Sequence, residues 1–215
     1  MKILSSLLAI VLWTVTTHAQ PSFVPHSLSE VSGSNAGEFF GFSLACVDSG
    51  NLLGVITGIP FRTVGGQVAA GAVGIIDPRD FTNNTFISTP HPATSGRFGY
   101  SVINFDDLTS DGTDEFLVGA PGEDRGGNPG IGTVYALQTN FSEVRRIGPP
   151  TGASTGEAVE WGYVVAEYAD VSGGAGSPSQ TPDGTDEVLI AAPNFSGGGG
   201  IVDMIDLGNT AMTSA

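Results

Sequence analysis

The stretch RFGYSVINF, residues 97–105, joins an aromatic residue to glycine and then alternates between apolar and polar side chains, as a half-buried strand does. The same aromatic–glycine pair opens two further stretches, at Phe40-Gly41 and Trp161-Gly162. The three pairs lie 58 and 63 residues apart along the chain. A period of about 60 residues with three or four strands in each unit indicates propeller blades or a similar β-array.

Short β-rich segments bounded by Gly, Asn, Asp and Pro recur within each period, and no helical periodicity follows the first twenty residues. We therefore predict an all-β chain with three units, at about residues 34–92, 93–155 and 156–215. The expected strands are FFGFSLACV (39–47), LLGVITGIP (52–60) and GAVGIID (71–77), then RFGYSVINF (97–105), EFLVGAP (115–121) and GTVYALQ (132–138), then EWGYVVAEY (160–168), EVLIAAP (187–193) and GIVDMID (200–206).

The residues at the unit starts and strand ends have distinct expected roles. The aromatic ring can anchor between neighbouring sheets, while glycine lets the backbone turn or pass close to another strand. The proline of the GIP, GAP and AAP triplets ends the second strand, because it cannot donate to a ladder. A fourth strand is expected at residues 81–88 and 141–147, and none is obvious after Asp206. The segment 22–33 resembles an outer strand that could complete the last sheet.

The N-terminus has the pattern of a secretory signal peptide. Lys2 precedes an apolar run from Ile3 to Val15, and Thr17-His18-Ala19 is a small-residue cleavage site. The run is shorter than the roughly 20 residues that a transmembrane helix needs. We predict a signal peptide at residues 1–19, a secreted chain of residues 20–215 and no membrane insertion, with a retained anchor as the alternative.

Composition narrows the class of partner. The formal net charge of −15 repels nucleic acid and anionic lipid headgroups and favours cations, so nucleic-acid binding is not expected. At 40% hydrophobic residues the chain is too apolar for a disordered acidic segment, so we expect a folded domain.

Covalent modification is expected at few positions. Cys46 is the single cysteine, which excludes an intrachain disulfide, and its alternating surroundings predict a small buried core residue. Three sequons, at Asn83, Asn140 and Asn194, are possible N-glycosylation sites in an exported protein.

The acidic loop DLTSDGTDE, residues 107–115, has oxygen-bearing residues at positions 1, 3, 5, 7 and 9. Calcium takes about six to eight hard oxygen ligands, and this spacing can wrap them around one ion. Gly112 permits the sharp turn. An EF-hand is excluded because its twelfth position would be Val118, followed by a strand-like segment. The predicted ligands are the side chains of Asp107, Thr109, Asp111 and Glu115 and the carbonyl of Thr113, with a solvated Asp-Gly hairpin as the alternative.

A second, weaker site is predicted in the third unit, where PDGTDE (182–187) echoes SDGTDE (110–115). Ten residues, 173–182, stand between its second and third ligand positions and could bulge outward or destroy the site. The first unit has only VDSGN (47–51) and is expected to be metal-free. The second ligand set is Asp170, Ser172, Asp183, Thr185 and Glu187.

Together these units resemble the FG-GAP repeat of integrin α-subunit β-propellers over residues 28–206, most specifically at Phe98-Gly99, at Leu117 to Pro121 and at Gly132 to Tyr135. The resemblance implies a propeller of about seven blades with calcium in some hairpin loops. The middle loop departs from the family pattern at Thr109 and Glu115, which implies weakened binding. Because three units cannot close such a ring, the chain is expected to be an incomplete propeller, with missing blades or self-association.

No nucleophile elbow, P-loop or Cys/His metal spacing is present in the sequence, and we predict a non-enzymatic protein. The resemblance implies a secreted, calcium-stabilised module for cell adhesion or recognition of an extracellular protein or glycan. Two alternatives stay open: an accessory propeller of a secreted hydrolase, such as a glycosylphosphatidylinositol-specific phospholipase, and a structural extracellular repeat. Calcium would stiffen the hairpin by offsetting carboxylate repulsion.

Overall fold

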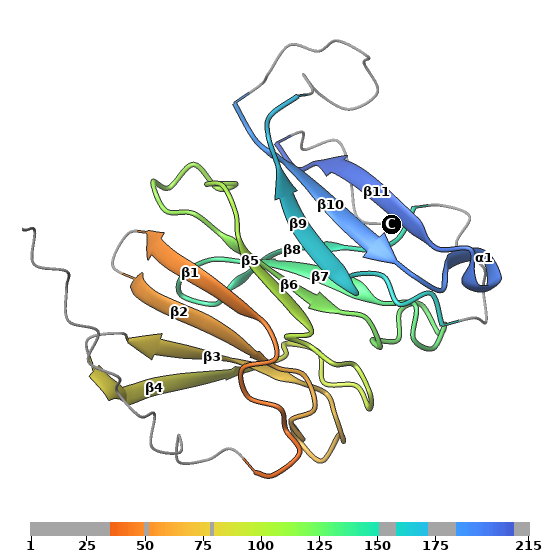
Figure 1. Cartoon of the computed structure of the whole chain (residues 1–215), viewed down its shortest axis with the longest axis horizontal. Coiled ribbons are helices and arrows are strands. Elements are labelled where there is room, and N and C mark those ends of the chain that lie inside the picture. The colour runs from red at the N-terminus through yellow and green to blue at the C-terminus, as the bar shows by residue number, and fades with distance from the viewer. Residues whose placement is uncertain (1–34, 50–51, 78–79, 151–157, 172–183, 209–215) are drawn as a thin grey trace, which may run out of the picture.

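Three antiparallel β-sheets follow one another along the chain in the computed structural model (Figure 1). The structure describes residues 35–49, 52–77, 80–150, 158–171 and 184–208. The predicted signal peptide and the segment 22–33 lie outside these ranges. The first sheet contains β1 (Leu44–Ser49), β2 (Leu52–Ile59), β3 (Ala72–Asp77) and β4 (Asp80–Ser88); the second contains β5 (Ser101–Asn104), β6 (Phe116–Ala120), β7 (Thr133–Leu137) and β8 (Glu143–Ile147); the third contains β9 (Val164–Tyr168), β10 (Glu187–Ala192) and β11 (Ile201–Asp206).

Each sheet is an antiparallel meander whose first strand lies on the inner side of the assembly. Strand β5 lies between β1 and β9 and neighbours both, and the sheets fan outward from these three strands (Figure 1). This is the arrangement of consecutive blades in an incomplete propeller, so the predicted fold class is confirmed. The fourth strands predicted at 81–88 and 141–147 are present as β4 and β8. Within the described part of the chain, the third sheet has three strands, and the short helix α1 (Phe195–Gly198) lies between β10 and β11.

The first strand of each unit starts four or five residues later than the sequence predicts, because the aromatic–glycine pair forms a turn. In this turn, the residue before the aromatic side chain and the glycine after it both have positive φ angles. The three turns have nearly the same backbone, which shows that they are one repeated motif. The φ values are 57° and 88° at Phe39 and Gly41, 58° and 90° at Arg97 and Gly99, and 60° and 86° at Glu160 and Gly162.

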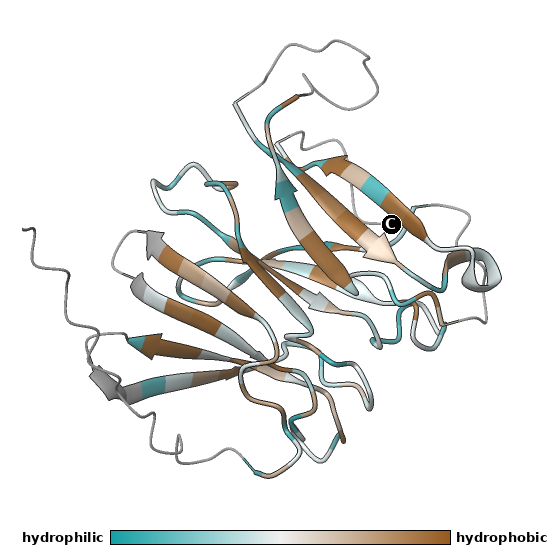
Figure 2. Cartoon of the chain, viewed as in Figure 1, coloured by the Kyte–Doolittle hydropathy of each residue, from teal (hydrophilic) through white to brown (hydrophobic). Residues whose placement is uncertain are grey.

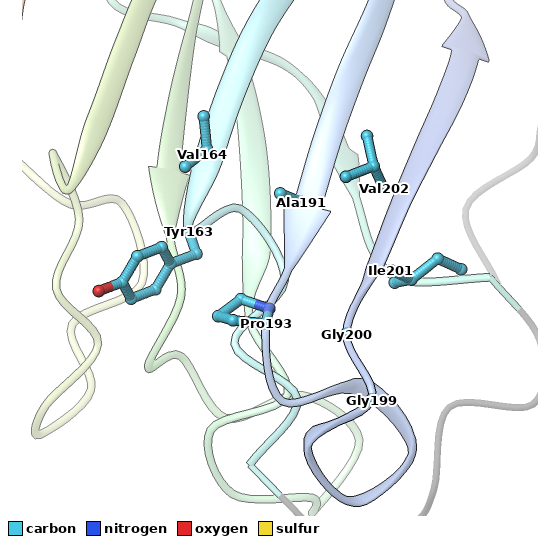
Figure 3. Close-up of a pocket in the computed structure, with 8 residues that line it drawn as sticks. All are labelled: Tyr163, Val164, Ala191, Pro193, Gly199, Gly200, Ile201 and Val202. Atoms are coloured by element: carbon cyan, nitrogen blue, oxygen red, sulfur yellow. The ribbon is translucent and has the colours of Figure 1, made fainter.

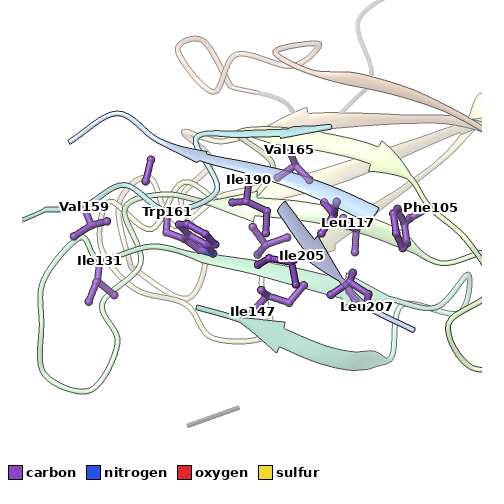
Figure 4. Close-up of a cluster of buried hydrophobic side chains, with 14 residues drawn as sticks. Phe105, Leu117, Ile131, Ile147, Val159, Trp161, Val165, Ile190, Ile205 and Leu207 are labelled. Atoms are coloured by element: carbon purple, nitrogen blue, oxygen red, sulfur yellow. The ribbon is translucent and has the colours of Figure 1, made fainter. Parts of the chain in front are cut away.

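The hydrophobic core consists of two layers, one at each junction between sheets. Strands β6 and β7 contribute to both layers, because successive side chains point to opposite faces of the second sheet. Leu117 and Val134 face the third sheet, whereas Val118 and Tyr135 face the first. Figure 4 shows the layer between the second and third sheets, with Trp161 between Val159 and Ile190.

Each junction is closed by the aromatic–glycine pair of the following sheet. Phe98 and Trp161 are entirely buried, and their backbones form parallel bridges with Gly71 and Gly132 of the preceding sheet. The hydroxyl groups of Ser43 and Ser101 donate to the carbonyls of Gly99 and Gly162, each at 2.9 Å. The aromatic anchor and the close backbone approach that the sequence pattern predicts are therefore both present.

The outer faces of the first and third sheets are more exposed than the junctions. Cys46 is exposed, so its predicted burial in the core is wrong. The strand alternates: Val47 faces the second sheet and is buried, whereas Leu44 and Cys46 point to the opposite face. Figure 2 shows that hydrophobic residues also run along the strands of the third sheet.

None of the helices in the described ranges is long and apolar enough to cross a membrane.

Candidate metal centre

The loop between β5 and β6 gathers three carboxylates. Asp107, Asp111 and Glu115 each offer an oxygen that lies within 4.8 Å of the others. Glu115 is fully buried, Asp107 is half-buried and Asp111 is exposed. The loop therefore brings together the carboxylates of all three acidic residues among the five that the sequence predicts as metal ligands.

Backbone hydrogen bonds hold the two aspartates in place. The Asp107 carboxylate accepts bonds from the amides of Asp111 at 3.0 Å and Gly112 at 2.8 Å. The Asp111 carboxylate accepts bonds from the amide of Thr113 at 2.9 Å and from its hydroxyl at 2.5 Å. The hydroxyl bond from Thr113 is the main cause of a lowered pKa at Asp111, which keeps this group ionised. Gly112 has a φ of 85°, which a side chain would disfavour.

Glu115 joins the loop to the buried strand. Its carboxylate accepts bonds from the amide of Leu108 at 2.5 Å and from the hydroxyl of Thr109 at 3.0 Å. Burial raises the pKa of Glu115, and the nearby charges of Asp107 and Asp111 add to this, while the two hydrogen bonds oppose it. A cation near this group would favour its ionised form.

Gln138 is a site residue that the sequence analysis missed. It follows β7, and its amide nitrogen donates to the carboxylate of Asp111 at 3.1 Å and to the hydroxyl of Thr109 at 3.3 Å. Its amide oxygen accepts from the hydroxyl of Ser142 at 2.6 Å. Rotation of the amide by half a turn would present the oxygen to the loop instead. No spacing signal could identify it, because it approaches from a different hairpin.

These residues fit the chemistry of a calcium site. Their donors are hard carboxylate and hydroxyl oxygens, which Ca²⁺ prefers. Thr113 contributes its amide and hydroxyl to Asp111, which orients that carboxylate within the loop.

The corresponding loop of the third sheet repeats two of these contacts. The amide of Val171 donates to Glu187 at 2.8 Å, as that of Leu108 does to Glu115. The amide of Gly184 donates to Asp170 at 2.7 Å, as that of Gly112 does to Asp107. The two ends of this loop are therefore built as in the second sheet. Two predicted ligands, Ser172 and Asp183, lie outside the described residues.

A second acidic group, which the sequence analysis did not predict, spans the junction of the second and third sheets. Carboxylate oxygens of Asp106, Glu167 and Asp186 lie within 4.8 Å of one another. The amide of Asp186 donates to the Asp106 carboxylate at 2.6 Å, which ties the two loops together. The members come from two different units, so no single motif reveals the group.

Two of the three sequon asparagines have described, exposed side chains. Asn140 lies between β7 and β8, and Asn194 follows β10 and donates to Glu160 at 2.7 Å. Asn83 lies in β4, and its side chain is outside the described part of the structure.

Comparison with known proteins shows which sequences this chain resembles. A family model described as the FG-GAP repeat matches residues 98–137, which run from the aromatic–glycine pair to the end of β7. The chain is also similar to integrin alpha-PS2 of Drosophila melanogaster, with 33% identity over 119 residues. That alignment covers 51% of this chain and 8% of the relative. The prediction of an integrin-alpha-like FG-GAP protein is confirmed, and the chain spans less than a tenth of the relative that it matches.

Proposed function

We propose that this chain is an extracellular recognition module in which the β5–β6 loop binds one Ca²⁺ ion. The FG-GAP repeat and the similarity to an integrin alpha chain support an integrin-like adhesion or recognition role, not an enzymatic one. The observation that carries the metal assignment is the convergence of Asp107, Asp111 and Glu115 within one loop.

The proposed ligands are the carboxylates of Asp107, Asp111 and Glu115 and the hydroxyl of Thr109, with the Thr113 carbonyl as a further candidate. Calcium would supply positive charge among three carboxylates, one of them fully buried. It would thereby stiffen the hairpin that enters β6, an inner strand of the second sheet. Its proposed role is structural, and extracellular modules of this kind bind at roughly 10⁻⁴–10⁻³ M.

A second, weaker calcium site is proposed in the third sheet, where Asp170, Thr185 and Glu187 occupy ligand positions. The contacts of Val171 and Gly184 support it, because they repeat those of the first loop. Ser172 and Asp183 complete the proposed set.

Secretion and glycosylation belong to the same proposal. The predicted signal peptide would export the chain, and the exposed side chain of Asn140 would accept a glycan. The ligand would be an extracellular protein or glycan. Mass spectrometry of the protein from a eukaryotic secretion host tests both points, through the mature N-terminus and the mass added at Asn140.

Isothermal calorimetry with calcium tests the metal site directly. We expect binding that Asp111→Asn abolishes and that the control Asp124→Asn preserves. Asp124 is an ideal control because it is also an exposed loop acid that accepts a backbone bond, from Gly130 at 2.9 Å. Binding that survives in Asp111→Asn with unchanged affinity would overturn the assignment of this loop.

Cell attachment to surfaces coated with the protein tests the recognition role. We expect attachment in calcium that is reduced by a chelator and by Asp111→Asn, but not by Asp124→Asn. Equal attachment of cells to an unrelated acidic β-protein would argue against recognition and favour a structural repeat.

A further inference from the structure

An open hollow lies on the outer face of the third sheet, beyond both core layers (Figure 3). It has a volume of about 450 Å³ and is lined by the start of β9, the end of β10 and the start of β11. Tyr163, Ala191, Gly200 and Val202 are among its lining residues. The lining is mostly apolar, so covering it with another apolar surface would be favourable.

The same place on the first and second sheets is filled by the aromatic–glycine turn of the next sheet. On the first sheet, the turn at Phe98-Gly99 bridges Gly71 and approaches Gly58. The ring of the following residue, Tyr100, lies 4.7 Å from that of Phe42.

On the second sheet, the turn at Trp161-Gly162 bridges Gly132 and approaches Gly119. The ring of Tyr163 then lies 4.7 Å from that of Tyr100. By position in the repeat, the hollow of the third sheet is equivalent to the places where these two turns dock. Gly200 takes the place of Gly71 and Gly132, and Tyr163 presents the next ring.

The exposure of equivalent residues supports the view that the hollow is an uncovered junction. Val134 and Ala136 of β7 are entirely buried beneath the third sheet. Their counterparts in β11, Val202 and Met204, are 67% and 49% exposed. The third sheet therefore has the side chains of a junction but no neighbour over them among the described residues.

The first sheet carries an aromatic–glycine turn of the kind that would fit this hollow. The turn at Phe40-Gly41 has the same backbone as the two docked turns, and a Cβ at Gly41 would meet no atom within 4 Å. Phe39, Phe42 and Leu44 around it are 60%, 42% and 63% exposed. Of the three aromatic–glycine turns in the described residues, this one has no preceding sheet to receive it.

We propose that a second copy of this chain docks head to tail, with its Phe40-Gly41-Phe42 turn in the hollow of the third sheet. The contact would repeat, between molecules, the junction that the chain already makes twice within itself. Such an interface is heterologous, so it builds closed rings or open chains of molecules, not a symmetric dimer. The proposal does not depend on calcium binding or on adhesion.

Two residues of the third sheet differ from their counterparts in the first and second sheets, and both differences should weaken docking of the incoming turn. A Cβ at Gly58 or Gly119 would lie 1.9 or 2.1 Å from the carbonyl of the incoming glycine, and the third sheet has Ala191 there. Val164 stands where Ser43 and Ser101 donate to that carbonyl. The incoming turn must therefore sit farther out and without this hydrogen bond, so we expect association that is weaker than an internal junction.

Sedimentation velocity of the purified protein over a concentration series tests the proposal. Val202→Asp on the third sheet and Phe42→Asp on the first should each abolish self-association. A mixture of the two variants should form a dimer and stop there, because each retains one intact half of the interface. The double variant Val164→Ser with Ala191→Gly, which restores the residues of the two internal junctions, should tighten association by about tenfold or more.

Circular dichroism and thermal melting show whether each variant is folded, which matters for Phe42 because it is 42% exposed and also contacts Tyr100 of the same chain. A monomer at all concentrations, in the double variant as well, would overturn the proposal. So would a lower melting temperature of Val202→Asp with unchanged association, which would assign the face to a segment of the same chain.

Discussion

Trp161 and Gly132 pair across the junction between the second and third sheets, and the indole side chain of Trp161 is completely buried. A Cβ built on Gly132 would lie 2.2 Å from the carbonyl oxygen of Trp161. Gly132 also has a φ of 86°, which disfavours any side chain. The glycine and the aromatic ring therefore act together, because the close approach of the two backbones sets the depth to which the ring enters the core.

Gly132→Ala should therefore separate the two sheets. We expect a loss of about 3 kcal/mol or more in the free energy of unfolding, from backbone strain and overpacking together. Gly127→Ala is the matched control, because Gly127 has a φ of 82° but open space around it, and it should cost only about 1–2 kcal/mol. Urea denaturation of both variants makes the comparison; equal losses would show that strain alone accounts for the effect.

The size of the anchor ring can be tested at Trp161. Trp161→Ala should lower the free energy of unfolding by about 3–5 kcal/mol, because it leaves a cavity in the core. Trp161→Phe should cost much less, because Phe98 performs the same role and the indole nitrogen makes no hydrogen bond among the described residues. Thermal melting of the two variants distinguishes these effects.

Arg146 should stabilise the fold through a buried partner. Its guanidinium contacts the carboxylate of Glu123, which is almost fully buried and also accepts from the hydroxyl of Tyr135. Burial raises the pKa of Glu123, while Tyr135 and Arg146 lower it. Arg146→Met removes one of these opposing partners and should cost about 3 kcal/mol at neutral pH.

The cost of Arg146→Met should shrink at acidic pH, because protonation neutralises the unpaired Glu123. The double variant with Glu123→Gln should recover most of the loss at neutral pH. Chemical denaturation at two pH values measures this, and a loss that does not change with pH would exclude an unpaired charge as its cause.

Glu167 should make the protein slightly less stable at neutral than at acidic pH. Burial raises its pKa, and a hydrogen bond with Asp186 and the charges of Asp186, Asp106 and Asp114 add to this. A carboxyl group with a raised folded-state pKa stabilises below its unfolded-state value, and this contribution is lost as the pH rises through the folded value.

Glu167→Gln should therefore raise stability at neutral pH and have no effect at acidic pH. Because Glu167 is exposed, the gain should not exceed about 0.5 kcal/mol. Melting curves across the pH range, with Asp124→Asn as control, provide the test; a gain that persists at acidic pH would assign it to packing instead.

Deletion of residues 173–181 should strengthen the proposed second calcium site. The loop ends already match those of the first site at Val171 and Gly184. Removal of these nine residues would leave Pro182 alone between Ser172 and Asp183, as Ser110 stands between Thr109 and Asp111, and would restore the spacing of Asp107 to Glu115. Calorimetry should show a second binding event, and unchanged stoichiometry and affinity would count against the insertion as the cause of weakness.

Much of this fold can be predicted from the sequence, because each repeat is marked by short sequence motifs. The aromatic–glycine pairs, the strand-ending prolines and the Asp-Gly turns each act over a few residues, so all three sheets and both fourth strands can be identified. The predicted start of each first strand is wrong by four or five residues, because alternation of apolar residues does not reveal that Phe39, Arg97 and Glu160 adopt positive φ angles.

The remaining features depend on which sheets meet. Cys46 alternates like a core residue, yet it is exposed, and no sheet among the described residues covers the face on which it lies. Gln138 and the group formed by Asp106, Glu167 and Asp186 come from separate hairpins, so their proximity is a property of the assembled fold. In the metal loop, by contrast, Asp107, Asp111 and Glu115 are close in sequence, and their convergence could be predicted from spacing.

Burial of the second sheet on both faces has a consequence for local opening of the molecule. Strands β6 and β7 lie between two core layers, whereas β4 and β11 are outer strands of sheets that each have one such layer. In an array of this kind, stability is a sum over units and their nearest-neighbour contacts. Backbone amides of β6 and β7 should therefore exchange with solvent deuterium most slowly, and the array should fray from both ends toward its centre.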